Sequence, residues 1–155
     1  MKKKIILSLV LSIIVLGCTG CNPETGTMTC TMSSYPTEGI TLRSTYKAQY
    51  KNNIVTELET VEQVIAEDED NLETYKDRID ELYNGYQGLD HYENKTTIED
   101  NTLTSTTTID YSKVDTDKLI EIDSGNAKLI KDGKVNIDDL QDMYRQNGCN
   151  CKKEA

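Results

Sequence analysis

The sequence has no tryptophan, no phenylalanine and a single histidine, His91. One histidine excludes a His-based catalytic triad or a His-rich metal site within one chain, and its expected place is the exposed start of a strand. Nine tyrosines supply the whole aromatic content. Because a tyrosine ring packs like an apolar group while its hydroxyl needs a partner, we expect a thin core with tyrosine hydroxyls at its rim.

Basic residues are also scarce, with 17 Lys and Arg against 27 Asp and Glu. Binding to nucleic acid requires basic residues that displace counterions, so we expect no nucleic-acid partner. The sequence contains no Gly-rich phosphate loop, nucleophile elbow or zinc signature. Acidic pairs such as Glu57 with Glu59 and Asp138 with Asp139 are expected to be solvated in so acidic a chain. We therefore predict no cofactor and no assembled catalytic site.

No apolar run is long enough to cross a bilayer, because residues 5–16 make about a dozen and a spanning helix needs about twenty. This run follows basic residues 2–4 and precedes Gly17 and Cys18, which is the order of an export signal. Val15-Leu16-Gly17-Cys18 resembles the lipobox of bacterial lipoproteins. In that family the cysteine carries a diacylglyceryl thioether and the peptide bond before it is cut. Two acyl chains are enough for stable anchoring.

These features predict a signal peptide at 1–17, a lipid-anchored tether at 18–26 and a single domain at 27–151, with Cys18 as the lipid attachment site. Removal of the leader takes three lysines and no acidic residue, so the formal net charge falls from −10 to −13. We expect the domain to stand at the extracytoplasmic face of the cell membrane, with the lipid anchor as its membrane contact.

Alternation of apolar and polar residues predicts an opening strand around 28–32 and two hairpins, with arms at 41–50 and 54–65 and at 89–98 and 103–111. In the last arm, threonines occupy alternate positions. They indicate a solvated strand surface near an edge or a flat polar binding face. The threonines are Thr102, Thr104, Thr106 and Thr108.

Steps of three and four between apolar residues predict a long helix over 70–84, a short one over 116–121 and a last one capped by Asn136. In the long helix we expect Leu72, Tyr75, Ile79 and Leu82 to face the sheet. The predicted fold class is α+β: an antiparallel sheet of about five strands with one long helix packed on it and a C-terminal helix closing one end.

The order of these elements resembles the YehR-like family of small bacterial lipoproteins. Three segments carry the resemblance, at 45–55, 83–89 and 108–115. The resemblance implies an α+β fold and an envelope location. It implies no activity, because none is assigned to the family. Some members lack cysteines after the lipidated one, so the resemblance does not pair the cysteines of this chain.

Four further cysteines lie at positions 21, 30, 149 and 151. An even set in a small extracytoplasmic domain is typical of disulfides. We predict that Cys30 pairs with Cys151 or alternatively with Cys149, because two cysteines one residue apart form only a strained ring and Cys21 lies on the tether. Cys149 would then pair with Cys21 or stay free.

Two metal sites compete with these interpretations. Met28, Cys30 and Met32 lie on one face of a strand, where Cys149 and Cys151 could complete a Cu(I) site. Ordinary strand packing explains the same pattern. Residues 132–140 resemble half of a calcium loop, but its first and third ligand positions would be Lys128 and Ile130. We therefore predict no metal, and a tight turn into a capped helix at 132–140.

We favour a binding or envelope-interaction function, in which an exposed surface of Thr and Tyr side chains binds an envelope protein or a cell-wall polymer. The alternative is a small extracytoplasmic hydrolase, or a thiol redox or metal-handling protein. A tyrosine pocket with two converging carboxylates, or a reducible pair formed by Cys149 and Cys151, would favour the alternative.

Overall fold

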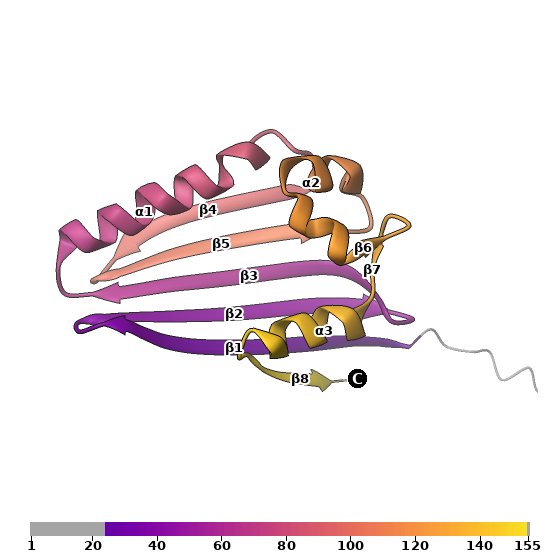
Figure 1. Ribbon diagram of the computed structural model, residues 1–155, viewed down its shortest axis with the longest axis horizontal. Helices are drawn as coiled ribbons and strands as arrows, with labels where there is room; N and C mark the ends of the chain where they lie inside the picture. The colour runs from indigo at the N-terminus through magenta and orange to yellow at the C-terminus, as the bar shows by residue number, and fades with distance from the viewer. Residues whose placement is uncertain (1–23, 155) are drawn as a thin grey trace, which may run out of the picture.

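The fold is an antiparallel sheet with three α-helices, seen in a computed structural model that describes residues 24–154 (Figure 1). The predicted signal peptide and Cys18 lie outside the described residues. Six strands pair in the order β4-β5-β3-β2-β1-β8, and every neighbouring pair is antiparallel. The strands are β1 (Thr25–Thr37), β2 (Ile40–Lys51), β3 (Ile54–Ala66), β4 (Tyr92–Glu99), β5 (Thr102–Asp110) and β8 (Asn150–Glu154).

Both predicted hairpins are confirmed. Asn52 and Asn53 join β2 to β3, and Asp100 and Asn101 join β4 to β5, all four with positive φ. Two residues with positive φ form the hairpin turn whose twist matches that of the flanking strands, and Asn and Asp tolerate that conformation.

Strand β8 is the element that the sequence did not predict, and it raises the sheet to six strands. It has five residues, of which three are charged, so its sequence carries no apolar alternation. Its position depends on pairing with β1, where Thr29 lies opposite Lys152 and Cys30 opposite Cys151. The sheet therefore runs from Thr25 to Glu154, past both ends of the predicted 27–151 domain.

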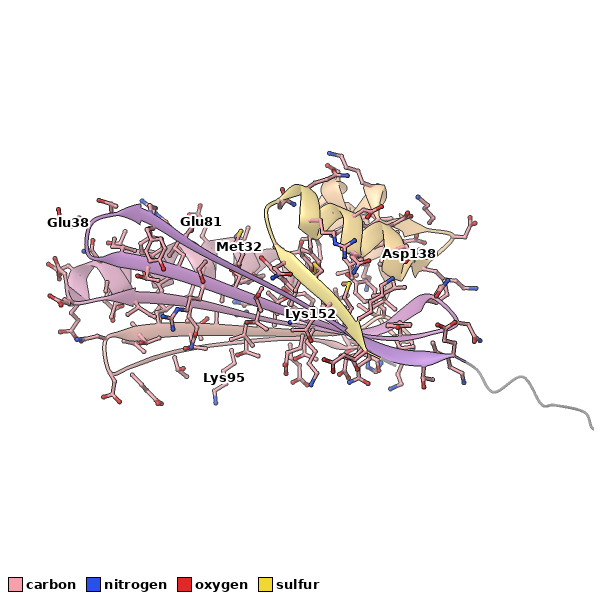
Figure 2. The ribbon with its side chains drawn as sticks, turned by 90° about the horizontal axis from the view of Figure 1, so that it is seen from below. Met32, Glu38, Glu81, Lys95, Asp138 and Lys152 are labelled. Carbon is pink, nitrogen blue, oxygen red and sulfur yellow. A yellow bond between two sulfur atoms is a disulfide. The ribbon has the colours of Figure 1, made fainter. Side chains whose placement is uncertain are left out.

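The helices lie on one face of the sheet, and within residues 24–154 no helix lies on the other (Figure 2). They are α1 (Glu69–Tyr83), α2 (Thr116–Ile122) and α3 (Ile137–Gln146). We call these two sides the covered face and the open face. Strand alternation places the four threonines of β5 on the open face, as predicted, and the Lys95 side chain points to that side (Figure 2).

Helix α1 begins where predicted, because the Asp68 side chain accepts a hydrogen bond from the main-chain N–H of Asp70 at 3.0 Å. Leu72 is buried against the sheet, but the prediction for Leu82 is wrong, since it is 63% exposed. At 100° per residue, Leu82 lies about 80° from Leu72 around the helix and Tyr83 only about 20°. Tyr83 therefore faces the sheet and Leu82 lies on the flank.

The C-terminal part follows the predicted turn and cap. A two-strand unit, β6 (Ile130–Lys131) and β7 (Lys134–Val135), turns at Asp132 and Gly133, both with positive φ. Asn136 then caps α3 by accepting a hydrogen bond from the N–H of Asp138 at 2.8 Å. The remaining short elements are the 3₁₀ helices η1 (Asn84–Tyr86) and η2 (Ser124–Lys128).

Two apolar clusters fill the covered face. The larger lies beneath α2 and α3 and includes Met28, Ala48 and Leu140. The smaller lies beneath α1 and includes Leu72 and Leu103. Polar and aromatic side chains of β3, β4 and β5 lie where these clusters meet.

Candidate functional site

Hydroxyl and amide groups lie on the covered face of β4 and β5, where a core would normally be apolar. Ser105 and Thr107 of β5 are 1% and 6% exposed. Asn94 of β4 donates hydrogen bonds from its amide nitrogen to both hydroxyl oxygens, at 3.1 and 2.8 Å. These bonds use the amide donors and leave the Asn94 carbonyl oxygen as an acceptor.

Tyrosine rings from five elements pack beside this polar group. Tyr46 of β2 stacks on Tyr144 of α3 with ring centroids 4.1 Å apart. Tyr86 of η1 stacks on Tyr92 of β4 at 4.7 Å, and Tyr83 of α1 lies 6.4 Å from Tyr86. These tyrosines lie on the covered face and the β5 threonines on the open face, so the threonines and tyrosines do not share one face of the sheet.

One carboxylate, that of Glu62 on β3, reaches the tyrosine rings. The Tyr83 hydroxyl donates a hydrogen bond to Glu62 Oε2 at 3.0 Å. Burial, with Glu62 as a further cause, raises the pKa of Tyr83 well above 10. Burial also raises the pKa of Tyr111, to about 12. The rings thus remain neutral hydrogen-bond donors across the physiological range.

A pocket of about 650 Å³ opens beside these rings at the edge of the sheet. The end of α1 and the 84–88 segment form one wall, and four consecutive β4 residues, 92–95, form another. Successive strand residues point to opposite faces, so a pocket that four of them line lies around the strand edge. Its lining is Asp80, Tyr83, Tyr86, Gln87, Gly88, Tyr92, Glu93, Asn94, Lys95, Thr106 and Thr108.

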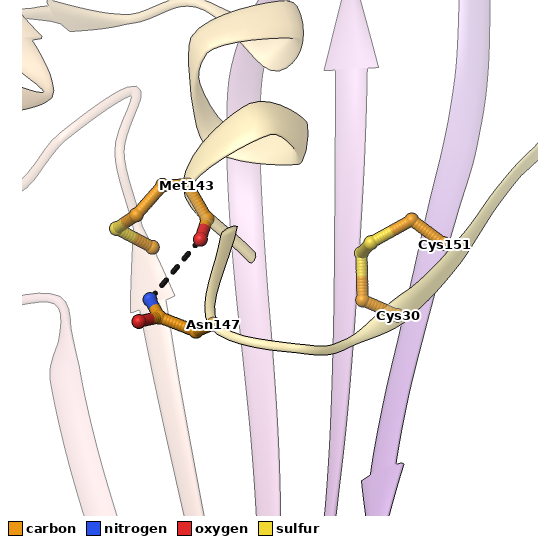
Figure 3. The surroundings of a disulfide bond; sticks show 4 residues. All are labelled: Cys30, Met143, Asn147 and Cys151. Carbon is orange, nitrogen blue, oxygen red and sulfur yellow. Dashed lines mark hydrogen bonds between the residues drawn. A yellow bond between two sulfur atoms is a disulfide. The ribbon is translucent and has the colours of Figure 1, made fainter. Parts of the chain in front are cut away.

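The predicted disulfide joins Cys30 to Cys151 (Figure 3). The two cysteines lie directly opposite each other in β1 and β8, with Cα atoms 4.0 Å apart. The bond therefore ties two strands, whereas a bond from β1 to a terminal helix was expected. Near the bond, α3 ends where the Asn147 side chain donates to the Met143 carbonyl oxygen at 3.0 Å (Figure 3).

Of the three cysteines in the described residues, Cys149 is the free one, and it is buried. Cys21 lies outside the described residues. The main-chain N–H of Cys149 donates to the Tyr144 carbonyl oxygen, and burial raises the pKa of the Cys149 thiol. The sulfur of Cys30 is bonded to Cys151, so it is not a free thiolate for the Cu(I) site. No group of three or more His, Cys, Asp or Glu side chains in residues 24–154 is placed to hold a metal ion.

The remaining candidates lie outside the pocket. His91 is exposed and directly precedes β4, as predicted. Glu57 accepts a hydrogen bond from Gln49 at 2.8 Å. Asp138 pairs with Lys153, and Asp139 with Lys131.

The site residues that the sequence did not reveal are Glu62, Gln87 and Asn94. Glu62 lies between apolar positions of β3, and Asn94 lies in the mostly polar strand β4, so alternation alone does not mark either residue. The one sequence signal was the segment Tyr83-Asn84-Gly85-Tyr86-Gln87-Gly88, where two tyrosines lie beside glycines at the end of a helix.

Two solved structures are similar to this chain. The NMR structure of a protein from Streptococcus pneumoniae TIGR4 matches with 17% identity and a TM-score of 0.53, over 98% of this chain and 99% of that one. The NMR structure of the E. coli YehR protein matches with 19% identity and a TM-score of 0.55, over 85% and 92%. No family model and no curated protein matches the chain. The likeness at these identities supports a YehR-like fold and says nothing about activity.

None of the helices described is both long and apolar enough to span a membrane.

Proposed function

We propose that the protein is a lipid-anchored protein of the extracytoplasmic membrane face that binds an envelope protein or a cell-wall polymer in the tyrosine pocket. The pocket is the observation that supports this. Three tyrosines offer ring faces and hydroxyls at one concave place, beside the amides of Gln87 and Asn94. Aromatic surface with a few polar groups is the usual composition of a binding site.

The position of the pocket is compatible with an anchor at Cys18. The described chain enters the sheet at β1, beside the edge strand β8, while the pocket lies at β4, the opposite edge. Three strands, β2, β3 and β5, lie between the point of entry at β1 and the binding edge at β4. A ligand at β4 would therefore bind at the edge of the sheet opposite to the one beside which the described chain enters.

Two pairings support binding over the alternative enzyme functions. Asp80, one of the carboxylates that line the pocket, forms an ion pair with Lys76 at 2.7 Å. Cys151 is bonded to Cys30, so a reducible Cys149 and Cys151 pair is not formed. One lining carboxylate is thus already paired, and the thiol pair that redox chemistry would need is absent.

The test is capture of envelope components with the purified protein, followed by binding measurements on captured proteins and on cell-wall fragments. We expect Tyr86→Ala to weaken binding roughly tenfold, because it removes a stacked ring worth about 1 kcal/mol beyond its buried area. Tyr35→Ala is the matched control, since Tyr35 lies on β1 and is 75% exposed. Equal binding by both variants would exclude the pocket.

A further inference from the structure

The unpaired edge of β4 offers main-chain hydrogen-bonding groups inside the wall of the pocket. β4 is the terminal strand of the sheet and pairs only with β5. The N–H of Asp110 donates to the His91 carbonyl oxygen at 3.0 Å, so these two residues form a hydrogen-bonded pair. Because such pairs alternate in an antiparallel ladder, the main chains of Asn94, Thr96 and Ile98 point away from β5.

These outward groups have no backbone partner within residues 24–154. The main-chain N–H of Tyr92 points the same way and is already bonded, to the Leu89 carbonyl oxygen at 3.3 Å. The open edge therefore begins after Tyr92. Asn94 both lines the pocket and presents its free N–H and C=O there.

The surroundings of this edge are acidic. A helix turns by about 100° per residue, so Glu69 and Glu73 lie on the same side of α1 as the pocket residue Asp80. On the open face, strand alternation gives β4 the side chains of Glu93 and Glu99. Lys76 and Lys95 are the basic residues there, and Lys76 is already paired with Asp80.

We propose that the edge of β4 binds an extended, basic peptide segment of an envelope protein as a seventh strand. This proposal rests on the proposed function and names its ligand class. Main-chain bonds to Asn94, Thr96 and Ile98 supply the affinity, and side chains at alternate positions reach the pocket or the open face. The charges on β4 restrict the partner, because edge strands with charged residues resist unselective pairing.

The probe is an end-capped peptide of alternating Thr and Lys, matched to the eight residues of β4. Its control replaces each Lys with Glu. We expect the purified protein to bind the Lys peptide and to bind the Glu peptide at least about tenfold more weakly, with the difference shrinking as salt rises. Equal binding of both peptides overturns the charge assignment and the proposal with it.

A protein variant tests the main-chain contact. Thr96→Pro removes an N–H that points away from β5, so it leaves the β4–β5 ladder intact. We expect it to lose peptide binding roughly tenfold, while Thr96→Ala binds like the wild type. If Thr96→Pro fails to fold, the wild-type protein is tested with two peptides. One is N-methylated at the odd-numbered residues and the other at the even-numbered residues, so that only one of them keeps the N–H groups that point to β4. Binding that is indifferent to both sets overturns the proposal.

Two other outcomes are distinguishable. If the peptide does not bind but Tyr86→Ala still weakens capture of an envelope component, strand addition is wrong and the proposed function stands. If the wild-type protein sediments as a dimer that Thr96→Pro converts to a monomer, a second copy of the chain occupies the edge and the peptide proposal is overturned.

Discussion

At the scale of single residues, tyrosine supplies the aromatic packing that phenylalanine supplies in most protein cores. Tyr46, Tyr92 and Tyr144 pack on or beside the larger apolar cluster and also carry hydroxyls. Each hydroxyl must be hydrogen-bonded or reach water, which keeps the covered face half polar. A polar pocket is therefore a direct consequence of building the core from tyrosine.

Buried tyrosines make the fold sensitive to alkali. Burial raises the pKa of Tyr111 to about 12 and that of Tyr144 further. A group whose folded-state pKa is raised stabilises the fold fully below its unfolded value, here 10, and loses that contribution as pH rises through the folded value. We expect stability to fall above about pH 10. Chemical denaturation followed alongside phenolate absorbance measures this, and unchanged stability up to pH 12 would contradict it.

The disulfide should stabilise the fold, by an amount that grows with the logarithm of the length of chain it closes. Cys30 and Cys151 are 121 residues apart. A crosslink that closes so long a loop restricts the unfolded chain and is worth roughly 2–4 kcal/mol. We expect Cys30→Ser to lower the free energy of unfolding by about that amount. Urea denaturation measures it. Cys149→Ser is the control, since that thiol is free, and it should keep the Cys30–Cys151 bond.

At the scale of elements, α1 is held to the sheet by a narrow stripe. Leu72 is 1% exposed, whereas Leu82 is 63% exposed. We expect Leu72→Ala to cost about 2–4 kcal/mol because it leaves a cavity, and Leu82→Ala to cost less than about 0.5 kcal/mol. Equal losses in denaturation experiments on the two variants would show that α1 lies differently on the sheet.

Patterns within one element predicted most of the fold. The alternation of β2, β3 and β5, the acidic start of α1 and the Asn136 cap are local features, so the sequence displays them directly. Strand β8 is different, because a charged five-residue segment becomes a strand only through pairing with β1. The pocket is harder still to predict, because its lining residues come from α1, η1 and β4, and no pattern within one of these elements shows that they meet.

Across the whole molecule, the two edges of the sheet differ. The terminal strand β8 is short and is tied to β1 by the disulfide, near the chain entry at Thr25. β4 carries no such tie and faces the pocket. The charges are also uneven, because residues 57–100 are dominated by acidic side chains. An acidic region of this kind is repelled by anionic lipid, so in the proposed lipid-anchored protein it would stand away from the membrane and present β4 to the envelope.

That orientation rests on the lipid anchor that we propose at Cys18. The apolar run before Cys18 is shorter than a bilayer-spanning helix needs, so the proposed anchoring relies on two acyl chains. We expect Cys18→Ser to remain unprocessed and unlabelled by fatty acid. Metabolic labelling with a fatty acid and the mass of the protein report both steps. Cys21→Ser is the matched control, because it lies three residues beyond the lipobox, and it should be cut and acylated normally. A Cys18→Ser protein that is still cut and acylated would show that the chain is anchored elsewhere.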